Sequence, residues 1–232
     1  MTSPDLPRTD GLRHPATWML DNFRWFGDWG VSRRFDVHVR GGENMPATGP
    51  VIVCSNHIGI IDGPLMAIYS PRPVHALTKS EMFVGKTGRF LLQAGQIPLH
   101  RGLSDPYAVK VGLKVLRAGH VLGIYPEGAR GGGELERFER GAAYFALATG
   151  ATVVPLAMFG SRHPGQGRND LPPKGSRIDM IYGEPFHVAA QPWPRTREQV
   201  GHVSKLLKEH MLVHLDRTRA STGLELPGPL PH

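Results

Sequence analysis

Apolar residues recur along this chain in short blocks whose spacing switches between two periods. Short runs or strict alternations of apolar and β-branched side chains are typical of strands. The predicted strands cover 35–40, 51–54, 74–77, 95–101, 121–125, 153–158 and 178–182. Apolar residues three and four positions apart are typical of amphipathic helices. The predicted helices cover 62–69, 83–92, 107–118, 141–149 and 196–218. This alternation indicates an α/β fold, with a central, largely parallel or mixed sheet flanked by helices on both faces.

The segment 16–30 adds an N-terminal amphipathic helix to this scheme. Its apolar residues form a stripe at helical spacing that only Asn22 interrupts, and three of the four tryptophans of the chain belong to it. The residues of the stripe are Trp18, Met19, Leu20, Phe23, Trp25, Phe26 and Trp29. Arg33 and Arg34 follow the stripe. Aromatic side chains flanked by arginines suit the interface between a membrane and water. The stripe equally suits packing against the domain, and one helix can do both.

One domain accounts for most of the chain. A length of 232 residues suffices for a single α/β domain with a full core, and no repeat divides it. We predict an N-terminal segment at 1–34 that carries the interfacial helix, the domain at 35–220, and a loose tail at 221–232 with three prolines and two glycines. Because no apolar run reaches the roughly 18 residues that a transmembrane helix needs, we expect the chain not to span a bilayer.

A histidine and an aspartate stand on either side of a predicted strand-to-helix turn. They follow the buried strand at 51–54, in the sequence Asn56-His57-Ile58-Gly59-Ile60-Ile61-Asp62. Within one helix this spacing would set the two side chains about 140° apart, whereas a turn can bring them together. The carboxylate would then orient the imidazole and leave its second nitrogen free to take a proton from a substrate hydroxyl. The alternative is that Asp62 only caps a helix and His57 is a core histidine.

The positive net charge of the chain favours some classes of binding partner over others. The formal net charge is +7 with a pI near 9.9, which favours anionic lipid, a phosphate-bearing substrate, coenzyme A or an acidic carrier protein. Nucleic acid is disfavoured because the basic residues are scattered and no zinc-finger or RNA-binding motif occurs. Cys54 is the only cysteine, so an intrachain disulfide is impossible, and its apolar strand predicts a buried, inert thiol.

This sequence lacks the signature motifs of several other enzyme classes. Gly85-Lys86-Thr87 resembles the end of a P-loop, but Ser80 stands where the first glycine is required. No Gly-x-Ser-x-Gly elbow of a serine hydrolase is present. The twelve histidines include no His-Glu-x-x-His pair, so we expect no metal site.

Three further segments follow the His57 motif along the chain. They are Gly95-Gln96-Ile97-Pro98-Leu99-His100-Arg101, Tyr125-Pro126-Glu127-Gly128-Ala129-Arg130 and Val153-Val154-Pro155-Leu156-Ala157-Met158. Together with the His57 motif they resemble the four ordered motifs of the glycerolipid acyltransferase family, which includes the 1-acylglycerol-3-phosphate acyltransferases. The resemblance covers about residues 50 to 160 and includes Lys79-Ser80-Glu81.

Two departures from the family pattern concern the third motif and the stretch that follows it. The family usually has Phe at the position of Tyr125 and Thr at the position of Ala129, so a hydroxyl that is often present at the second position is missing. The usual Phe-Lys-x-Gly reads here as Phe138-Glu139-Arg140-Gly141, which moves the positive charge by one position.

The resemblance implies a role for each motif in an acyltransferase domain. His57 would take the proton from the acceptor hydroxyl, and Asp62 would hold the imidazole and stabilise its protonated form. Arg101 and the turn from Glu127 through Gly128 to Arg130 would bind phosphate or glycerol, with Glu127 orienting an arginine or a glycerol hydroxyl. Lys79 would add positive charge, and Pro155 would line the pocket. The alternative for Arg101 and Arg130 is a pair of solvated surface arginines.

The resemblance also implies the substrates. An acyl group would move from acyl-CoA or acyl-carrier protein to a lysophospholipid, most simply 1-acylglycerol-3-phosphate, giving phosphatidic acid for phospholipid biosynthesis. No cofactor beyond that co-substrate and no metal is implied, and the enzyme would act as a peripheral, monotopic protein on the cytoplasmic face of an anionic membrane surface. The alternatives are a glycerol 3-phosphate or other lysolipid acceptor, or a non-catalytic lipid- or acyl-carrier-binding protein on the same scaffold. The motif residues His57, Asp62, Arg101, Glu127 and Gly128 are all present, which disfavours the last alternative.

Overall fold

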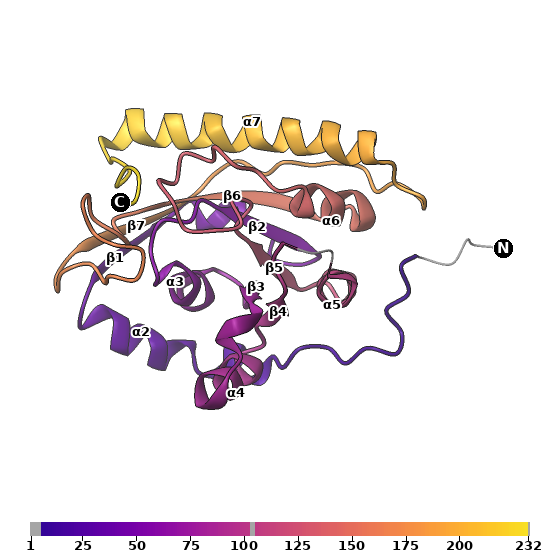
Figure 1. Ribbon diagram of the computed structural model, residues 1–232, viewed down its shortest axis with the longest axis horizontal. Coiled ribbons are helices and arrows are strands. Elements are labelled where there is room, and N and C mark those ends of the chain that lie inside the picture. Colours follow the sequence, from indigo (N-terminus) through magenta and orange to yellow (C-terminus); the bar gives the residue numbers. More distant parts are fainter. Residues whose placement is uncertain (1–5, 103–104, 232) are drawn as a thin grey trace.

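A seven-stranded sheet forms the centre of the protein in a computed structural model that describes residues 6–102 and 105–231 (Figure 1). The strand order is β1-β7-β6-β2-β5-β3-β4. Strands β2 to β6 run in one direction, while β1 and β7 pair with each other in parallel and run against β6. The strands are β1 Asp36–Arg40, β2 Val51–Ser55, β3 Val74–Lys79, β4 Ile97–Leu99, β5 Val121–Ile124, β6 Thr152–Phe159 and β7 Arg177–Tyr182. The predicted mixed α/β fold is confirmed.

Helices cover both faces of the sheet, which explains why its central strands are apolar throughout. On β2, Ile52 and Cys54 point into a core shared with α5, α6 and α7, whereas Val51 and Val53 point into a core shared with α2 and α3. Alternate side chains of a strand face opposite sides, so a strand covered twice needs apolar residues at every position. The helices are α1 Trp18–Asn22, α2 Arg24–Ser32, α3 Asp62–Tyr69, α4 Gly85–Gln93, α5 Pro106–Arg117, α6 Gly141–Thr149 and α7 Arg197–Thr222, with 3-10 turns at Gly42–Asn44 and Ser80–Met82.

The N-terminal segment differs from the single helix predicted at 16–30. It forms two helices, α1 and α2, which part at Phe23. The Asn22 side chain donates to the backbone oxygen of Trp18 at 2.7 Å, a local bond by which asparagine competes with the helix backbone. Helix α2 lies close to α3, because a Cβ on Gly27 would stand only 2.8 Å from the side chain of Ile68.

The C-terminal tail is packed where a loose segment was predicted from residue 221. Helix α7 starts with a capping box at Thr196 and continues to Thr222 before Gly223 ends it in the left-handed conformation. Leu226 is buried against the cluster that includes Ile58. Two leucines of the tail, Leu224 and Leu226, pack against this cluster, and extended chain accommodates the prolines that follow them.

The strand predicted at 95–101 is shorter in the structure and covers only Ile97–Leu99. Gly95 and Gly102 have positive φ and turn the chain on either side of it. Arg101 therefore lies in the loop beyond the strand. None of the helices within the described ranges is long and apolar enough to cross a membrane.

Candidate active site

The turn between β2 and α3 brings His57 and Asp62 into contact, as their spacing predicted. Nδ1 of His57 lies 2.8 Å from Oδ2 of Asp62. A carboxylate only accepts hydrogen bonds, so Nδ1 carries the proton and Nε2 presents its lone pair. The His57 side chain is 20% exposed while that of Asp62 is fully buried, and Nε2 bonds to no residue in the described part of the chain. The pair therefore has a buried, fixed end and an open, basic end.

Asp62 is surrounded by donors and does not cap its helix. Oδ2 also accepts from the backbone N–H groups of Ile58 at 2.8 Å and Gly59 at 2.9 Å, and Oδ1 accepts from the hydroxyl of Ser161. The N-cap position of α3 is Ile61. Gly59 is required at this turn, because a Cβ there would lie 2.2 Å from the backbone oxygen of Ser161. The simple capping interpretation of Asp62 is therefore wrong.

An aromatic ring fixes the plane of the imidazole. Tyr125, the residue after β5, stacks on His57 with ring centroids 4.1 Å apart and planes 20° apart. Burial raises the pKa of the Tyr125 hydroxyl well above its ordinary value, so the ring is neutral. This hydroxyl has no hydrogen-bond partner among the described residues. Stacking is thus the contribution of Tyr125, and a phenylalanine would supply it equally.

The side chain of Glu127 binds the backbone of His57. Its Oε1 accepts from the backbone N–H of His57 at 2.8 Å, and the side chain is buried. This contact differs from the predicted one with an arginine or a glycerol hydroxyl. Burial raises the pKa of Glu127 to about 7, partly opposed by the hydrogen bond from His57, while the negative charge of Asp62 raises it further.

Replacing Glu127 with glutamine should change how stability depends on pH. Because the folded pKa, about 7, exceeds the ordinary 4.5, the folded protein holds a proton that the unfolded chain releases between these values. Glu127 therefore makes the free energy of unfolding fall by up to about 1.4 kcal/mol per pH unit across this interval, with no further change above it. Glutamine does not titrate but keeps an oxygen for the His57 N–H.

Denaturant unfolding of both proteins across this pH range measures the effect. We expect the variant to gain stability relative to the parent as pH rises from about 4.5 to about 7, followed by a constant difference. A difference that is the same at every pH would show that Glu127 does not titrate in this range.

Two predicted arginines lie together beside this pair, and a third joins them. Arg101 donates to the backbone oxygen of Gly128, and Arg130 donates to that of Arg168 at 2.8 Å. Burial lowers the pKa of Arg130, and the charges of Arg168 and Arg101 lower it further, whereas Asp62 raises it. None of the three arginines forms an ion pair within the described ranges. Uncompensated guanidinium groups at this density suit an anion such as phosphate.

Two other predicted site residues are not part of this group. Lys79 pairs with Glu81 at 2.9 Å, which offsets its charge. Pro155 is buried in β6 and lines a cavity of about 10 Å³ under α7, together with Met211 and His214. That volume holds no substrate, so the geometry gives no support to Pro155 as a pocket residue. Among the described residues, no group of three or more His, Cys, Asp or Glu side chains is arranged to hold a metal ion.

The sequence patterns missed Ser161, Arg162 and Arg168, which follow β6. Ser161 stands 99 positions beyond Asp62, and Arg162 donates to the backbone of Ile58 from 104 positions away. No local period or motif links residues at such separations. Only the pairing of β2 with β6, which sets the ends of both strands side by side, could have found them.

Comparison with known proteins supports the resemblance. The family described as Acyltransferase matches residues 36–159. The 1-acyl-sn-glycerol-3-phosphate acyltransferase of Bacillus subtilis is 30% identical over 183 residues, 78% of this chain and 89% of that protein. The protein of the same name from Borreliella burgdorferi is 33% identical over 132 residues, 55% of this chain and 52% of that protein.

A solved structure supports the fold. The crystal structure of the 1-acyl-sn-glycerophosphate (LPA) acyltransferase PlsC from Thermotoga maritima superposes with a TM-score of 0.68 at 20% sequence identity. The superposition covers 88% of this chain and 81% of that one. At 20% identity the structural likeness establishes a shared fold only. Activity is compared through the sequence relatives.

Proposed function

Because the chain belongs to the acyltransferase family and is therefore an O-acyltransferase, we propose that it moves a fatty acyl group from a thioester to a lysophospholipid hydroxyl. The proposed acceptor is 1-acylglycerol-3-phosphate, which yields phosphatidic acid, and the proposed donor is acyl-CoA or acyl-carrier protein. The names of the relatives support this acceptor. The observation that carries the proposal is the buried Asp62 beneath the partly exposed His57, whose Nε2 has no hydrogen-bond partner among the described residues, next to arginines that form no ion pair there.

The chemistry needs one base. Nε2 of His57 accepts the proton of the acceptor hydroxyl as its oxygen bonds to the thioester carbonyl carbon. The carbon–sulfur bond then breaks, and the thiolate leaves with the proton from the imidazolium, so an ester and a thiol are formed. Asp62 stabilises the transient positive charge of His57 and keeps its ring in place. No acyl-enzyme is required, because the substrate supplies the nucleophile.

The arginines would bind the phosphate of the acceptor. Guanidinium groups hold phosphate oxygens through paired donors, and Arg101 and Arg130 come from two turns that converge on one place, where Arg168 adds a third charge. Gly128, with a φ of 69°, provides a turn that leaves space near the backbone. This arrangement favours acceptors that carry a phosphate.

An assay with a labelled acyl thioester and a panel of acceptors tests the proposal. Arg101→Ala and Arg130→Ala should each weaken the use of a phosphate-bearing acceptor, by roughly tenfold or more in kcat/KM, since a charge-assisted bond contributes about 1.5 to 3 kcal/mol. Slow hydrolysis of the thioester by water should change little, because water has no phosphate to hold. The panel includes glycerol 3-phosphate and other lysolipids, the alternative acceptors.

Arg197→Ala, in the exposed first turn of α7 on the opposite side of the sheet from α4 (Figure 1), is a matched control for the loss of one surface arginine. Equal losses of transfer and hydrolysis in the Arg101 and Arg130 variants would point to misfolding or to the donor site. Wild-type protein that transfers to no acceptor in the panel would favour a binding protein on the same scaffold.

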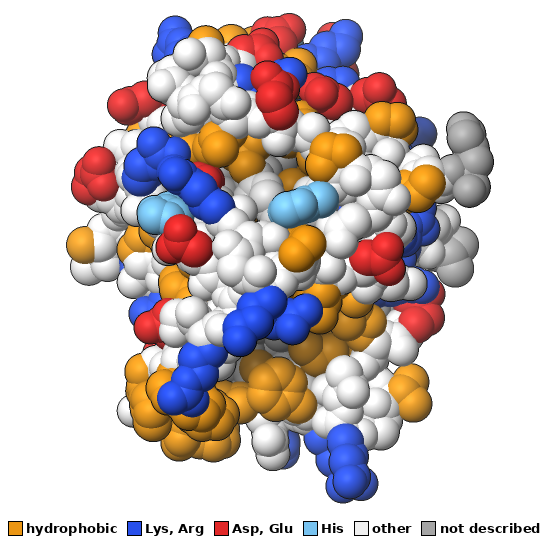
Figure 2. All heavy atoms as spheres, turned by 90° about the vertical axis from the view of Figure 1, so that its left-hand side faces the viewer, with side chains coloured by type: hydrophobic (Ala, Val, Ile, Leu, Met, Phe, Trp, Pro, Cys, Tyr) orange, Lys and Arg blue, Asp and Glu red, His pale blue; other side chains and the backbone are white. Residues whose placement is uncertain are grey.

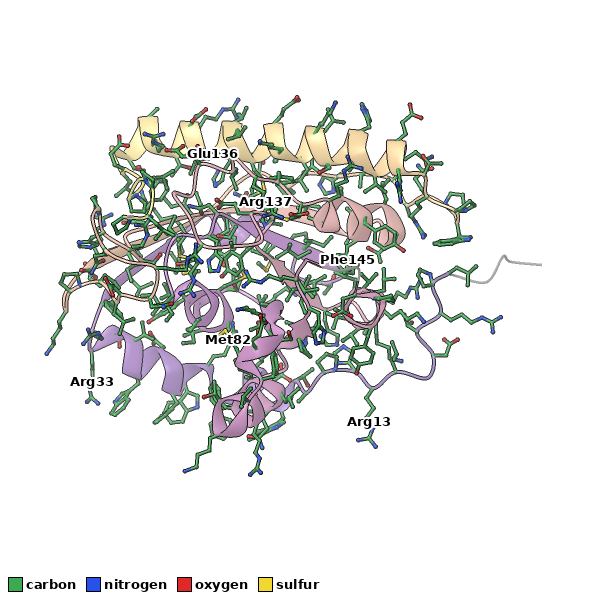
Figure 3. All side chains as sticks on the ribbon, viewed as in Figure 1. Arg13, Arg33, Met82, Glu136, Arg137 and Phe145 are labelled. Carbon is green, nitrogen blue, oxygen red and sulfur yellow. The ribbon has the colours of Figure 1, made fainter. Side chains whose placement is uncertain are left out.

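We also propose that the chain docks on an anionic membrane surface, as a peripheral protein at the cytoplasmic face. Helices α2 and α4 lie on the side of the sheet opposite α7 (Figure 1), and hydrophobic side chains gather beside Lys and Arg on the lower part of the face in Figure 2. The guanidinium of Arg33 stacks 3.7 Å from the centre of the Trp29 ring and points away from the domain (Figure 3). The exposed apolar residues of this membrane-facing surface are Trp18, Phe23, Trp25, Phe26 and Trp29 from the N-terminal helices and Met82, Val84, Phe90 and Leu92 in and beside α4.

Helix α2 packs on the domain through its small and aliphatic residues, Gly27 and Val31. Its aromatic side chains are therefore left exposed to solvent. An exposed patch of this kind is costly in water and stable at a lipid interface. The net charge of +7 adds attraction to anionic lipid that salt screens.

Replacing Trp18, Trp25 and Trp29 together with serine should abolish the salt-resistant part of vesicle binding. Vesicle flotation of the parent should show stronger association with anionic than with neutral lipid and partial release by high salt. Trp193→Ser is the control, because this equally exposed tryptophan precedes α7, which covers the opposite face. A folded triple variant that binds as the parent does would move the contact to the surface of α4, beside Lys86 and Arg89.

A further inference from the structure

A buried arginine next to the site bonds only to backbone oxygens within the described part of the chain. The side chain of Arg162 is 1% exposed, the largest among the fully buried side chains. Its Nε donates to the oxygen of Ile58 at 2.9 Å, and its Nη2 donates to those of Gly131 at 2.9 Å and Gly228 at 2.6 Å. Nη1 donates to the oxygen of Gln166 at 3.2 Å. One guanidinium thus joins four separate backbone positions.

This arrangement is costly to build. A buried charge loses its hydration, and no ion pair to Arg162 occurs in the described part of the chain. Burial lowers the pKa of Arg162, and the charge of Asp62 raises it. The planar fork of a guanidinium can reach several carbonyls at fixed angles, which an ammonium cannot. An apolar residue would fill the space at lower cost but would not hold these backbone segments in register.

The segments that Arg162 joins are those that carry the proposed chemistry. Ile58 follows the base His57, and Gly131 follows Arg130, which we assign to the phosphate. These two turns also bond directly, since the N–H of Gly131 donates to the oxygen of His57 at 2.9 Å. Gly228 belongs to the packed tail. The residue before Arg162, Ser161, donates to Oδ1 of Asp62.

We propose that Arg162, together with Ser161, is a positioning residue that sets the His57 turn at a fixed distance from the phosphate-binding turn. When the phosphate of the acceptor is held by arginines, its free hydroxyl then meets Nε2 of His57. The inference rests on the proposed role of His57 as the base. Displacement of a reacting group by about 1 Å can cost on the order of 10² in rate, so a loosened connection between the turns should be visible in acyl transfer.

Arg162→Lys tests this connection, because lysine keeps the positive charge but lacks the planar guanidinium that donates to several carbonyls at once. We expect the ratio of acyl transfer to thioester hydrolysis by water to fall about tenfold to a hundredfold, since water needs no alignment with a bound phosphate. A smaller folded fraction would lower both rates equally and leave this ratio unchanged. Leu226→Ala is a second, milder variant, which loosens the tail that carries Gly228 and should lower the ratio less.

Arg72→Lys is the matched control. Arg72 also donates to three backbone oxygens, those of Pro46 at 3.0 Å, Gly49 at 2.9 Å and Gly119 at 2.6 Å. Gly49 and Gly119 precede β2 and β5, at the opposite ends of these strands from the site. This variant should lose stability while the ratio stays at the wild-type value.

The same assay separates the inference from the function on which it rests. If His57→Ala keeps normal transfer, the proposed function fails and the inference fails with it. Two results would overturn the positioning role while the proposed function stands, provided that His57→Ala is inactive. In the first, both Arg162→Lys and Leu226→Ala keep the wild-type ratio of acyl transfer to hydrolysis. In the second, Arg72→Lys lowers this ratio as much as they do. A lower ratio in Arg162→Lys, or in Leu226→Ala where the lysine variant does not fold, with Arg72→Lys unchanged, supports the positioning role.

Discussion

His57→Ala should lower acyl transfer by about 10² to 10⁴ while the protein stays folded. The loss follows from removing the base whose Nε2 is the open end of the buried pair. The fold should survive because Asp62 keeps three other donors, from Ile58, Gly59 and Ser161. Steady-state transfer to 1-acylglycerol-3-phosphate and thermal unfolding measure the two effects separately.

A second histidine provides the control for this substitution. Nδ1 of His100 lies 2.9 Å from Oδ2 of Asp105, with the same five-residue spacing as in the His57 pair. The His100 side chain is 72% exposed, and Asp105 caps α5 by accepting from the backbone N–H of Ala108. His100→Ala should therefore leave transfer within a few-fold of the parent. Near-normal transfer by a folded His57→Ala protein would end the proposal that His57 is the base.

Asp62→Asn should lower acyl transfer by about 10², somewhat less than the loss of the base itself. The asparagine oxygen can face the N–H groups of Ile58 and Gly59, and its amide can donate to Ser161, whose hydroxyl is able to accept. The turn should thus persist. A neutral amide, however, does not stabilise the imidazolium that forms during proton transfer.

The rate of transfer by the Asp62→Asn protein, compared with its unfolding free energy, separates charge from geometry. We expect stability to fall by no more than a few kcal/mol, because the N–H groups of Ile58 and Gly59 keep an acceptor and only the Ser161 hydroxyl loses one. If transfer stays near the wild-type rate, the negative charge is not needed, and Asp62 serves only to hold the turn.

The interior strands and most helices could be predicted from the chain because their signal is local. Buried central strands need continuous apolar residues, and helices that cover one face need apolar residues three or four apart. Boundaries that depend on a single contact were predicted less well. The break at Phe23 follows from the hydrogen bond of Asn22, and the packed tail follows from the burial of Leu226.

The contact between His57 and Asp62 was predictable for a related reason. A short strand-to-helix turn leaves few conformations, so two residues on either side of it can meet without a partner from elsewhere in the chain. The partners of Glu127 and Pro155 were not predictable in this way. Each depends on how the end of one strand faces another, and strand order is not written in any local pattern.

By itself, the sequence determined the alternation of strands and helices, the position of His57 at a strand end, and the separate motifs that indicate the family, because each depends on residues close together in the chain. The five-residue spacing alone could not distinguish the pair His57–Asp62 from the pair His100–Asp105. The tertiary structure decided between them: pairing of β2 with β6 places Ser161 and Arg162 against the first pair, whereas His100 of the second pair lies exposed beside a helix cap. Burial and long-range hydrogen bonds hold the first pair in place, and these bonds come from segments about a hundred residues apart.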